Sequence, residues 1–181
     1  KISGCTMSDT ILTGVSACHA CTIACGRVVR LEGKDQPGLK RKGPEYETVV
    51  GFGPNLLNDD LASIVLMGEL CDRYGMDTIS TSNIIGLAFT LYEIGLLTRS
   101  QTGGLELSWG DMRVVETLIK QMAYRQKLGA WMAEGARSLG ARVESFYLHG
   151  MDIQPCDACD ACQSEPYRGC VIGDDMQILY P

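Results

Sequence analysis

The chain has 181 residues, 45% of them hydrophobic, which is enough to bury the core of one ordinary domain or of two small ones. Its 22 acidic residues outnumber its 16 basic ones and give a net charge of −6, so a phosphate-binding surface with clustered Lys and Arg is not expected. No apolar run approaches the roughly 20 residues that span a bilayer, and no signal-peptide pattern opens the sequence. We therefore expect a cytoplasmic protein that binds neither nucleic acid nor membrane.

Apolar residues that recur every three or four positions predict a mainly helical fold as far as about Gly140. Each predicted helix begins at a polar cap or after a glycine, and a glycine stands at or just beyond its end. A loop is predicted over residues 32–38, which contain glycine and proline. The predicted helices are Asp60–Gly75, Ser80 or Thr81 to Gly95, Asp111–Gly129 and Ala130–Leu139.

The sequence changes character after Gly140. Residues 141–148 are rich in β-branched and aromatic side chains and predict a strand, and a short helix is predicted after an Asp174 or Asp175 cap. One strand and one helix are too few for a complete sheet domain. We therefore predict a mainly α domain over residues 1–138 and a small, incomplete α/β segment over residues 139–181.

Nine cysteines are many for a chain of this size. Their number is odd, and seven of them lie in two tight clusters, which favours metal or cluster binding over disulfides. The two that remain, Cys5 and Cys71, are expected to be buried apolar thiols. The clustered residues are Cys18, Cys21 and Cys25, and then Cys156, Cys159, Cys162 and Cys170.

The first cysteine cluster has the spacing C-x2-C-x3-C, which is typical of a [4Fe-4S] site that takes its fourth ligand from elsewhere in the fold. His19 lies between two of these cysteines and is expected to be a solvent-facing loop residue. The second cluster has the spacing C-x2-C-x2-C-x7-C and closes a four-thiolate site by itself. Tetrahedral zinc remains an alternative to iron there, because both metals accept four thiolates.

Two pairs of carboxylates are candidates for chemistry. Glu45 and Glu47 lie in a segment rich in glycine and proline, and Asp72 and Asp77 lie near the predicted end of a helix. Taken alone, these side chains are more readily explained as solvated surface groups.

Together with the cysteines, these acids form a recognisable pattern, and residues 1–137 closely resemble the aldehyde ferredoxin oxidoreductases. The resemblance implies a multihelical fold like the middle domain of those enzymes, and a [4Fe-4S] cluster on the first three clustered cysteines. It also implies a tungsten or molybdenum bis-pterin contacted by Asp72, Gly75, Met76 and Asp77, with Glu45 or Glu47 near the metal as the catalytic acid or base. The matching segments are CHACTIACGRVVRLE, KGPEYETVVGFGPNLLNDDLASI, LCDRYGMDTISTSNIIGLAFTLYEIGLLT, LELSWGD and LIKQMAYRQKLGAWMAEGAR.

The family's reaction oxidises aldehydes to carboxylic acids and passes electrons through the cluster to ferredoxin or another redox partner. Its chains are much longer than this one, and this sequence corresponds only to their middle part. We therefore expect another subunit or segment to supply the missing domains. The fourth cluster ligand of the family also comes from such a segment, with Cys71, or failing that Cys5, as the internal substitute.

Residues 139–181 resemble a different family, the iron–sulfur flavoproteins of the flavodoxin-like FMN reductase group. The resemblance is carried by LGARVESFYLHGMDIQPCDACDACQSEPYRGCVIGDDMQILYP. It implies a second [4Fe-4S] cluster that exchanges electrons with FMN. The cluster ligands would be Cys156, Cys159, Cys162 and Cys170.

Three functions therefore follow from the sequence. The first is an aldehyde ferredoxin oxidoreductase or a component of one. The second is an iron–sulfur electron-transfer protein related to NADPH-dependent FMN reductases, and the third is a zinc-stabilised helical binding module without redox activity. Iron, sulfide, tungsten and zinc contents distinguish the three.

Overall fold

The computed structural model describes residues 1–31, 39–139 and 172 of the chain. All but residue 172 belong to one of the two units into which contacts divide the chain, Lys1–Ala141. The loop predicted over residues 32–38, the strand predicted over residues 141–148, the short helix that follows it and the second cysteine cluster lie outside the described residues.

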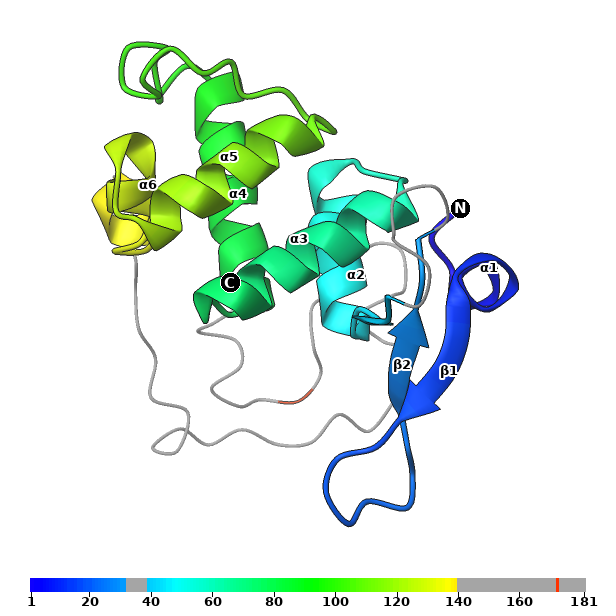
Figure 1. Cartoon of the computed structure of the whole chain (residues 1–181). Coiled ribbons are helices and arrows are strands. Elements are labelled where there is room, and N and C mark those ends of the chain that lie inside the picture. The colour runs from blue at the N-terminus through cyan, green and yellow to red at the C-terminus, as the bar shows by residue number, and fades with distance from the viewer. Residues whose placement is uncertain (32–38, 140–171, 173–181) are drawn as a thin grey trace. The chain divides into compact units, whose positions relative to one another are not determined.

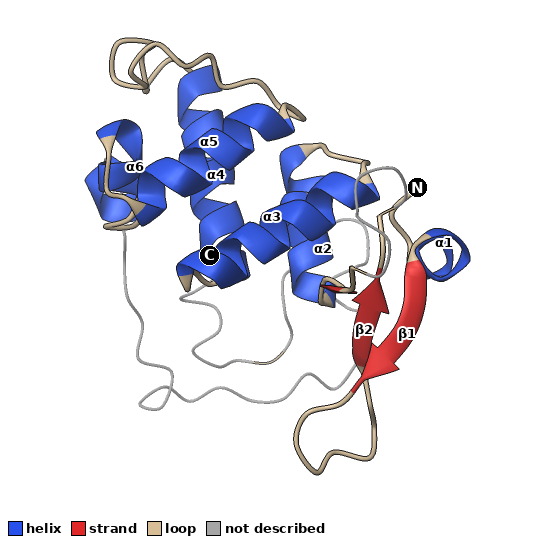
Figure 2. Cartoon of the chain, viewed as in Figure 1, coloured by secondary structure: helices blue, strands red, loops and turns tan. Residues whose placement is uncertain are grey.

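The described unit is mainly helical, which confirms the predicted fold class (Figures 1 and 2). None of the helices in this part of the chain combines the length and the apolar character that crossing a membrane requires. The elements in chain order are α1 (Gly4–Thr10), β1 (Leu12–Ser16), β2 (Gly26–Val29), β3 (Arg41–Lys42), α2 (Tyr46–Phe52), η1 (Pro54–Leu56), α3 (Leu61–Tyr74), α4 (Thr78–Glu93), α5 (Met112–Ala123), α6 (Lys127–Met132) and η2 (Ala136–Leu139).

Helix α3 forms where the sequence predicts it. The side chain of Asp60 accepts a hydrogen bond from the backbone N–H of Ala62 at 3.1 Å, and Gly75 ends the helix in the left-handed conformation. The apolar face predicted for this helix is buried, and much of it contributes to the main hydrophobic core. The same core takes in α4, α5 and α6, so the helices pack around one apolar centre.

Helix α4 begins earlier than predicted. It starts at Thr78 because the carboxylate of Asp77 accepts a hydrogen bond from the backbone N–H of Ser80 at 2.7 Å. The predicted start at Ser80 or Thr81 is therefore wrong by two or three residues. The end of the helix, at Glu93 just before Gly95, agrees with the sequence analysis.

The third and fourth predicted helices have different bounds in the structure. Asp111 caps α5 as predicted, with its carboxylate 3.0 Å from the backbone nitrogen of Arg113, but α5 ends at Ala123. The next helix, α6, already begins at Lys127. Gly129 lies inside α6, where a Cβ atom would overlap the backbone of Gln121 and Met122. This glycine permits close packing of α6 on α5 and does not end a helix.

A three-stranded antiparallel sheet, in the order β1-β2-β3, lies between α1 and α2 in the chain and was not predicted. Leu12 pairs with Val29 at one end of the β1–β2 hairpin, and Ser16 pairs with Gly26 at the other. A second, smaller apolar cluster joins the sheet to α3. Its members are Met7, Val29, Leu31, Leu61 and Val65.

The contact between α2 and α4 gives the first testable prediction. A Cβ atom on Gly51 of α2 would overlap the buried side chain of Ser82, so Gly51→Ala is expected to lower the free energy of unfolding by about 1–3 kcal/mol. Urea unfolding followed by circular dichroism measures the change.

Gly86→Ala in α4 is the matched control. A Cβ atom there would lie 3.7 Å from Leu56 Cδ2, which is an ordinary contact, and the higher helix propensity of alanine should leave stability unchanged or raise it by up to about 1 kcal/mol. Equal losses in the two variants would contradict the packing described for α2.

Candidate functional site

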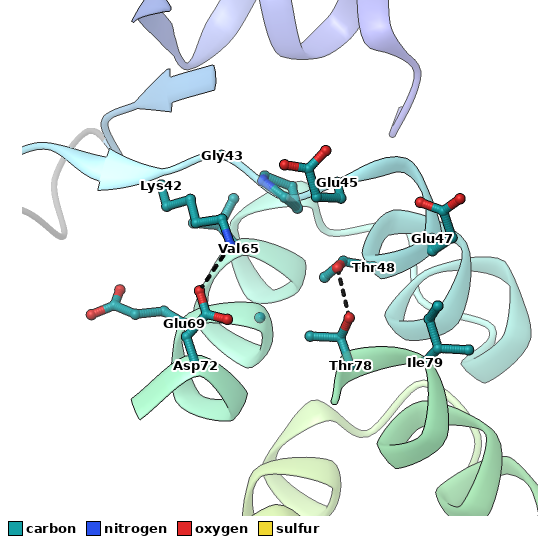
Figure 3. A pocket seen from close by; sticks show the side chains of 12 residues that line it. Lys42, Gly43, Glu45, Glu47, Thr48, Val65, Glu69, Asp72, Thr78 and Ile79 are labelled. Atoms are coloured by element: carbon teal, nitrogen blue, oxygen red, sulfur yellow. Dashed lines mark hydrogen bonds and ion pairs between the residues drawn. The ribbon is translucent and has the colours of Figure 1, made fainter. Parts of the chain in front are cut away.

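A pocket of about 210 Å³ lies where β3 and the start of α2 face α3 and α4 (Figure 3). Three of the site residues predicted from the sequence line it, namely Glu45, Glu47 and Asp72. They come from two helices separated in the chain, so the fold brings them to one cavity. The other lining residues are Lys42, Gly43, Pro44, Thr48, Val65, Gly68, Glu69, Thr78 and Ile79.

The start of α2 sets the position of the two glutamates. Glu45 is the N-cap residue in an extended conformation, and its side chain makes no capping hydrogen bond. Glu47 lies in the first helical turn, and both side chains are exposed. In Figure 3 their carboxylates lie at the rim of the pocket and point away from Asp72. They are therefore accessible to a molecule that enters the pocket.

Asp72 lies on the other side of the pocket, in the last turn of α3. Its Oδ2 atom is 3.4 Å from the Nζ atom of Lys42, which ends β3. Both side chains are at least half exposed, so solvent screens this ion pair and its contribution to stability is at most about 1 kcal/mol. A ligand with hydrogen-bond donors can therefore reach the Asp72 carboxylate without breaking a strong internal contact.

A pair of threonine hydroxyls lies between α2 and α4. The Oγ1 atoms of Thr48 and Thr78 are 2.9 Å apart, and Thr48 is buried. Together with Lys42 and Glu69, these residues belong to the pocket although the sequence analysis did not single them out. No local pattern marks them, because their proximity arises only when α2 packs on α3 and α4.

The D-x-x-G-M-D segment divides between two pockets. Asp72 lines the first, whereas Met76 and Asp77 line a second one of about 380 Å³ between α4, α5 and α6. Gly75 ends α3 and lines neither. The hydrogen bond from the Ser80 backbone N–H holds the pKa of Asp77 below its usual range, so this carboxylate is ionised at neutral pH. Asp77 thus has a structural role as a helix cap in addition to any contact with a cofactor.

Cys18, Cys21 and Cys25 lie in the loop of residues 17–25 that joins β1 to β2, and all three are exposed. Figure 1 shows this loop extending from the end of the hairpin, away from the helices. His19 is exposed there, as expected. The thiols match an iron–sulfur cluster in donor type. Within residues 1–31, 39–139 and 172, no three His, Cys, Asp or Glu side chains are gathered closely enough to hold a metal ion.

The two isolated cysteines differ from each other. Cys71 is completely buried in the main hydrophobic core, and burial raises the pKa of its thiol to about 11. It is the buried apolar thiol expected from the sequence, and its complete enclosure in the core gives it a packing role. Cys5 is exposed on α1, so the expectation that it is buried is wrong.

A partly buried group of charges joins the sheet to α3. The Glu69 carboxylate accepts hydrogen bonds from Arg41 of β3 and from Arg73, one helical turn further along α3. The Arg41 side chain is 14% exposed, so this contact is better protected from water than the Lys42–Asp72 pair. It fixes β3, and with it the start of α2, against the helix that carries Asp72.

Comparison with known proteins identifies matches over most of the chain. The family model for aldehyde ferredoxin oxidoreductase, domains 2 and 3, matches residues 1–157 and so overlaps the segment that resembles the iron–sulfur flavoproteins. A tungsten-containing aldehyde ferredoxin oxidoreductase of Thermococcus kodakarensis is 41% identical over 136 residues, which are 74% of this chain and 22% of that protein. The protein of the same description from Pyrococcus horikoshii is 36% identical over 163 residues, 87% of this chain and 26% of the relative.

Two further matches are more distant. The WOR-like subunit of an aliphatic sulfonate oxidoreductase from Pyrococcus furiosus is 30% identical over 75% of this chain and 21% of that protein. Among solved structures, the active-site complex BamBC of benzoyl coenzyme A reductase, in complex with 1,5-dienoyl-CoA, matches with a TM-score of 0.59 and 24% identity. That match covers 74% of this chain and 19% of the other, and at this identity it shows a shared fold alone. The chain thus spans only about a quarter or less of the curated relatives it matches.

The burial of Cys71 gives the second testable prediction. In the folded chain, stripped of metal and reduced, iodoacetamide at pH 8 should modify the exposed thiols of Cys5, Cys18, Cys21 and Cys25, whereas Cys71 should react only after denaturation. Tandem mass spectrometry of the digested protein identifies the modified positions. Rapid native modification of Cys71, at a rate close to that of Cys5, would contradict its place in the core.

Proposed function

The chain belongs to the aldehyde ferredoxin oxidoreductase family, and on this premise we propose that it forms the cofactor-binding part of a tungsten-containing oxidoreductase. The observation that carries the proposal is the pocket that gathers Glu45, Glu47 and Asp72 within the segment matched by the family. Asp72 is far from the two glutamates in the sequence, and only the packing of α2 on α3 brings the three carboxylates to one cavity.

The proposed reaction is the oxidation of an aldehyde to a carboxylic acid. The relatives from Thermococcus kodakarensis and Pyrococcus horikoshii are named aldehyde ferredoxin oxidoreductases, which supports an aldehyde as substrate. The relative named for an aliphatic sulfonate indicates that substrates differ within the group. Tungsten is the metal in the names of the first two. Molybdenum remains the alternative, since the same pterin holds either metal.

The pocket residues fit such a cofactor in their chemistry. A bound tungsten pterin supplies the two-electron oxidation. The carboxylate of Asp72 is a suitable acceptor for the amine hydrogens of a pterin, and the weak contact with Lys42 leaves it free to bind such a group. Asp77, which lines the second pocket together with Met76, offers a further carboxylate, and Gly75 precedes them in the segment proposed for cofactor binding.

The two rim glutamates are the proposed proton acceptors. Oxidation of a hydrated aldehyde releases protons, and a carboxylate within hydrogen-bond reach can accept one of them. Glu45 and Glu47 are exposed at the opening of the pocket and form no ion pair with another described residue, so one of them is available to the entering substrate. We assign the role to this pair without choosing between its members.

The loop of residues 17–25 is the proposed exit for electrons. Cys18, Cys21 and Cys25 would hold a [4Fe-4S] cluster, with the fourth ligand from a segment or subunit beyond the described residues. Ferredoxin or another redox protein would then accept the electrons. The cysteine spacing and the family match support this part, and a cytoplasmic location is proposed with it.

A second cluster is proposed on Cys156, Cys159, Cys162 and Cys170. Its support is the spacing of the four cysteines in the sequence, which suffices for a complete site. FMN, implied by the resemblance of residues 139–181 to iron–sulfur flavoproteins, is proposed as its redox partner. Flavin analysis of the purified protein tests that assignment separately.

Metal analysis tests the cofactor assignment. Protein purified without oxygen should contain iron, sulfide and tungsten and should absorb visible light, because iron–sulfur clusters are coloured. Cys18→Ser should lower the iron content, and Thr22→Ser, at an exposed position of the same loop, should leave it unchanged. Zinc without visible absorbance would contradict the proposal and favour the helical binding module, and iron without tungsten would favour an electron carrier.

The role of the rim glutamates is tested by activity. In the complete enzyme, Glu45→Gln or Glu47→Gln is expected to lower kcat for aldehyde oxidation by a factor of about 10² to 10⁴, because the amide cannot accept a proton. Glu106→Gln, at an exposed position outside the pocket, is the matched control. Full activity in both single variants and in the double variant would contradict the assignment.

A further inference from the structure

We propose that Cys18 and Cys21 form a disulfide whenever the loop of residues 17–25 carries no metal cluster. The pair is then a site of thiol–disulfide exchange with low-molecular-weight disulfides. The bridge itself follows from the backbone of the loop and does not depend on the proposed function.

The backbone holds these two cysteines in a tight turn. The N–H of Cys21 donates a hydrogen bond to the carbonyl oxygen of Cys18 at 3.0 Å, with His19 and Ala20 as the central turn residues. In such a turn the first and fourth Cα atoms are less than about 7 Å apart. Disulfides join cysteines whose Cα atoms are about 4.4–6.8 Å apart, so this turn suits a bridge between its ends.

Ala20 has the backbone conformation that this turn requires at its third position. Its φ angle is 57°, in the left-handed region that residues with a side chain seldom adopt. This conformation at the third turn position accompanies the hydrogen bond that closes the turn. The two cysteines are therefore held near each other by the backbone itself.

Cys25 occupies a different place in the loop. It lies directly before β2, after a second left-handed residue, Ala24, with a φ angle of 50°. It is outside the turn that joins Cys18 to Cys21, and the three thiols are not gathered at one point in the described structure. The loop thus contains one pair and one single thiol, all of them exposed and open to a small reagent.

The exchange proceeds in two balanced steps. A thiolate of the pair attacks one sulfur of oxidised glutathione, breaking its S–S bond, and releases one glutathione thiolate. The second cysteine, after losing its proton to solvent, attacks the cysteine sulfur of the mixed disulfide and releases the second glutathione. The two protein thiols are oxidised by two electrons, and one glutathione disulfide is reduced to two thiols.

The bridge would control when a cluster can enter the loop, and this consequence rests on the proposed function. Two of the three proposed ligands are blocked in the disulfide, so a thiol reductant must act before iron is taken up. The loop would be protected in this way from irreversible oxidation of its thiols after a cluster is lost.

The test uses the full chain, stripped of metal with a chelator and reduced, and then incubated with oxidised glutathione. Free thiols are alkylated and the protein is cut with trypsin, which releases residues 2–27 as one peptide that contains Cys5, Cys18, Cys21 and Cys25. Tandem mass spectrometry should find Cys18 joined to Cys21. Cys25 should carry either the alkyl group or glutathione.

Variants separate the proposed pair from other pairs. Cys25→Ser should keep the bridge, and Cys21→Ser should abolish it and leave glutathione on Cys18. Ala20→Gly should keep it as well, because glycine adopts the left-handed conformation without strain. A dominant bridge that includes Cys25, or glutathione on both Cys18 and Cys21 without a bridge, would overturn the inference.

Iron uptake distinguishes this inference from the proposed function. This experiment uses the chain with Cys156→Ser and Cys159→Ser, which removes the proposed second cluster site. After incubation with iron and sulfide, the bridged protein should remain without a cluster until dithiothreitol is added, and the reduced protein should acquire one. Equal iron uptake by the bridged and the reduced protein would overturn the proposal that the bridge controls cluster insertion. A bridge between Cys18 and Cys21 with no uptake in either form would support the disulfide and contradict the cluster proposed for this loop.

Discussion

The close contact of α2 with α3 and α4 is the constraint on which the pocket depends. Gly51 allows α2 to lie against the buried Ser82 of α4, and the hydroxyls of Thr48 and Thr78 meet at 2.9 Å beside it. Because α2 is only seven residues long, its orientation is set by these contacts and hardly by its own helical hydrogen bonds. If α2 moved away, Glu45 and Glu47 would no longer share a cavity with Asp72.

The small sheet links the cysteine loop to the same pocket. One end of the β1–β2 hairpin carries the loop of residues 17–25, and β3 pairs with β2 and ends at Lys42 on the pocket wall. Both residues of β3 form ion pairs with α3, through Glu69 and Asp72. One connected set of elements therefore carries the proposed electron exit and the proposed cofactor site. The sheet is the element that connects the two.

The sequence predicted those features that depend on local signals. Helix α3 has an aspartate cap, a regular apolar face and a terminal glycine, and its bounds agree with the structure. The start of α4 was misplaced because Asp77 was considered only as a cofactor contact, although an aspartate before a helix is a strong cap. The end of α5 was misplaced because Gly129 serves contact between helices, which periodicity cannot reveal. The strands were missed because they are short, and β1 includes a glycine.

In the candidate site, too, some residues are predictable from the sequence and others only from contacts between distant elements. Its acids were found through a resemblance that extends over most of the described unit, whereas Lys42, Thr48, Thr78 and Glu69 have no distinguishing local pattern. They enter the site only through contacts between elements distant in the chain. Cys71 is the opposite case, because the structure removes it from the candidate site. The sequence analysis names Cys71 as a substitute cluster ligand, whereas its burial in the core assigns it to packing.

Anomalous X-ray diffraction from crystals of the cofactor-loaded enzyme that contains this chain, recorded at the iron and tungsten absorption edges, would locate both proposed metals. We expect a tungsten peak at the pocket lined by Glu45, Glu47 and Asp72, and an iron peak at the loop that carries Cys18, Cys21 and Cys25. A tungsten peak remote from this pocket, or no iron peak at the loop, would contradict the proposed function.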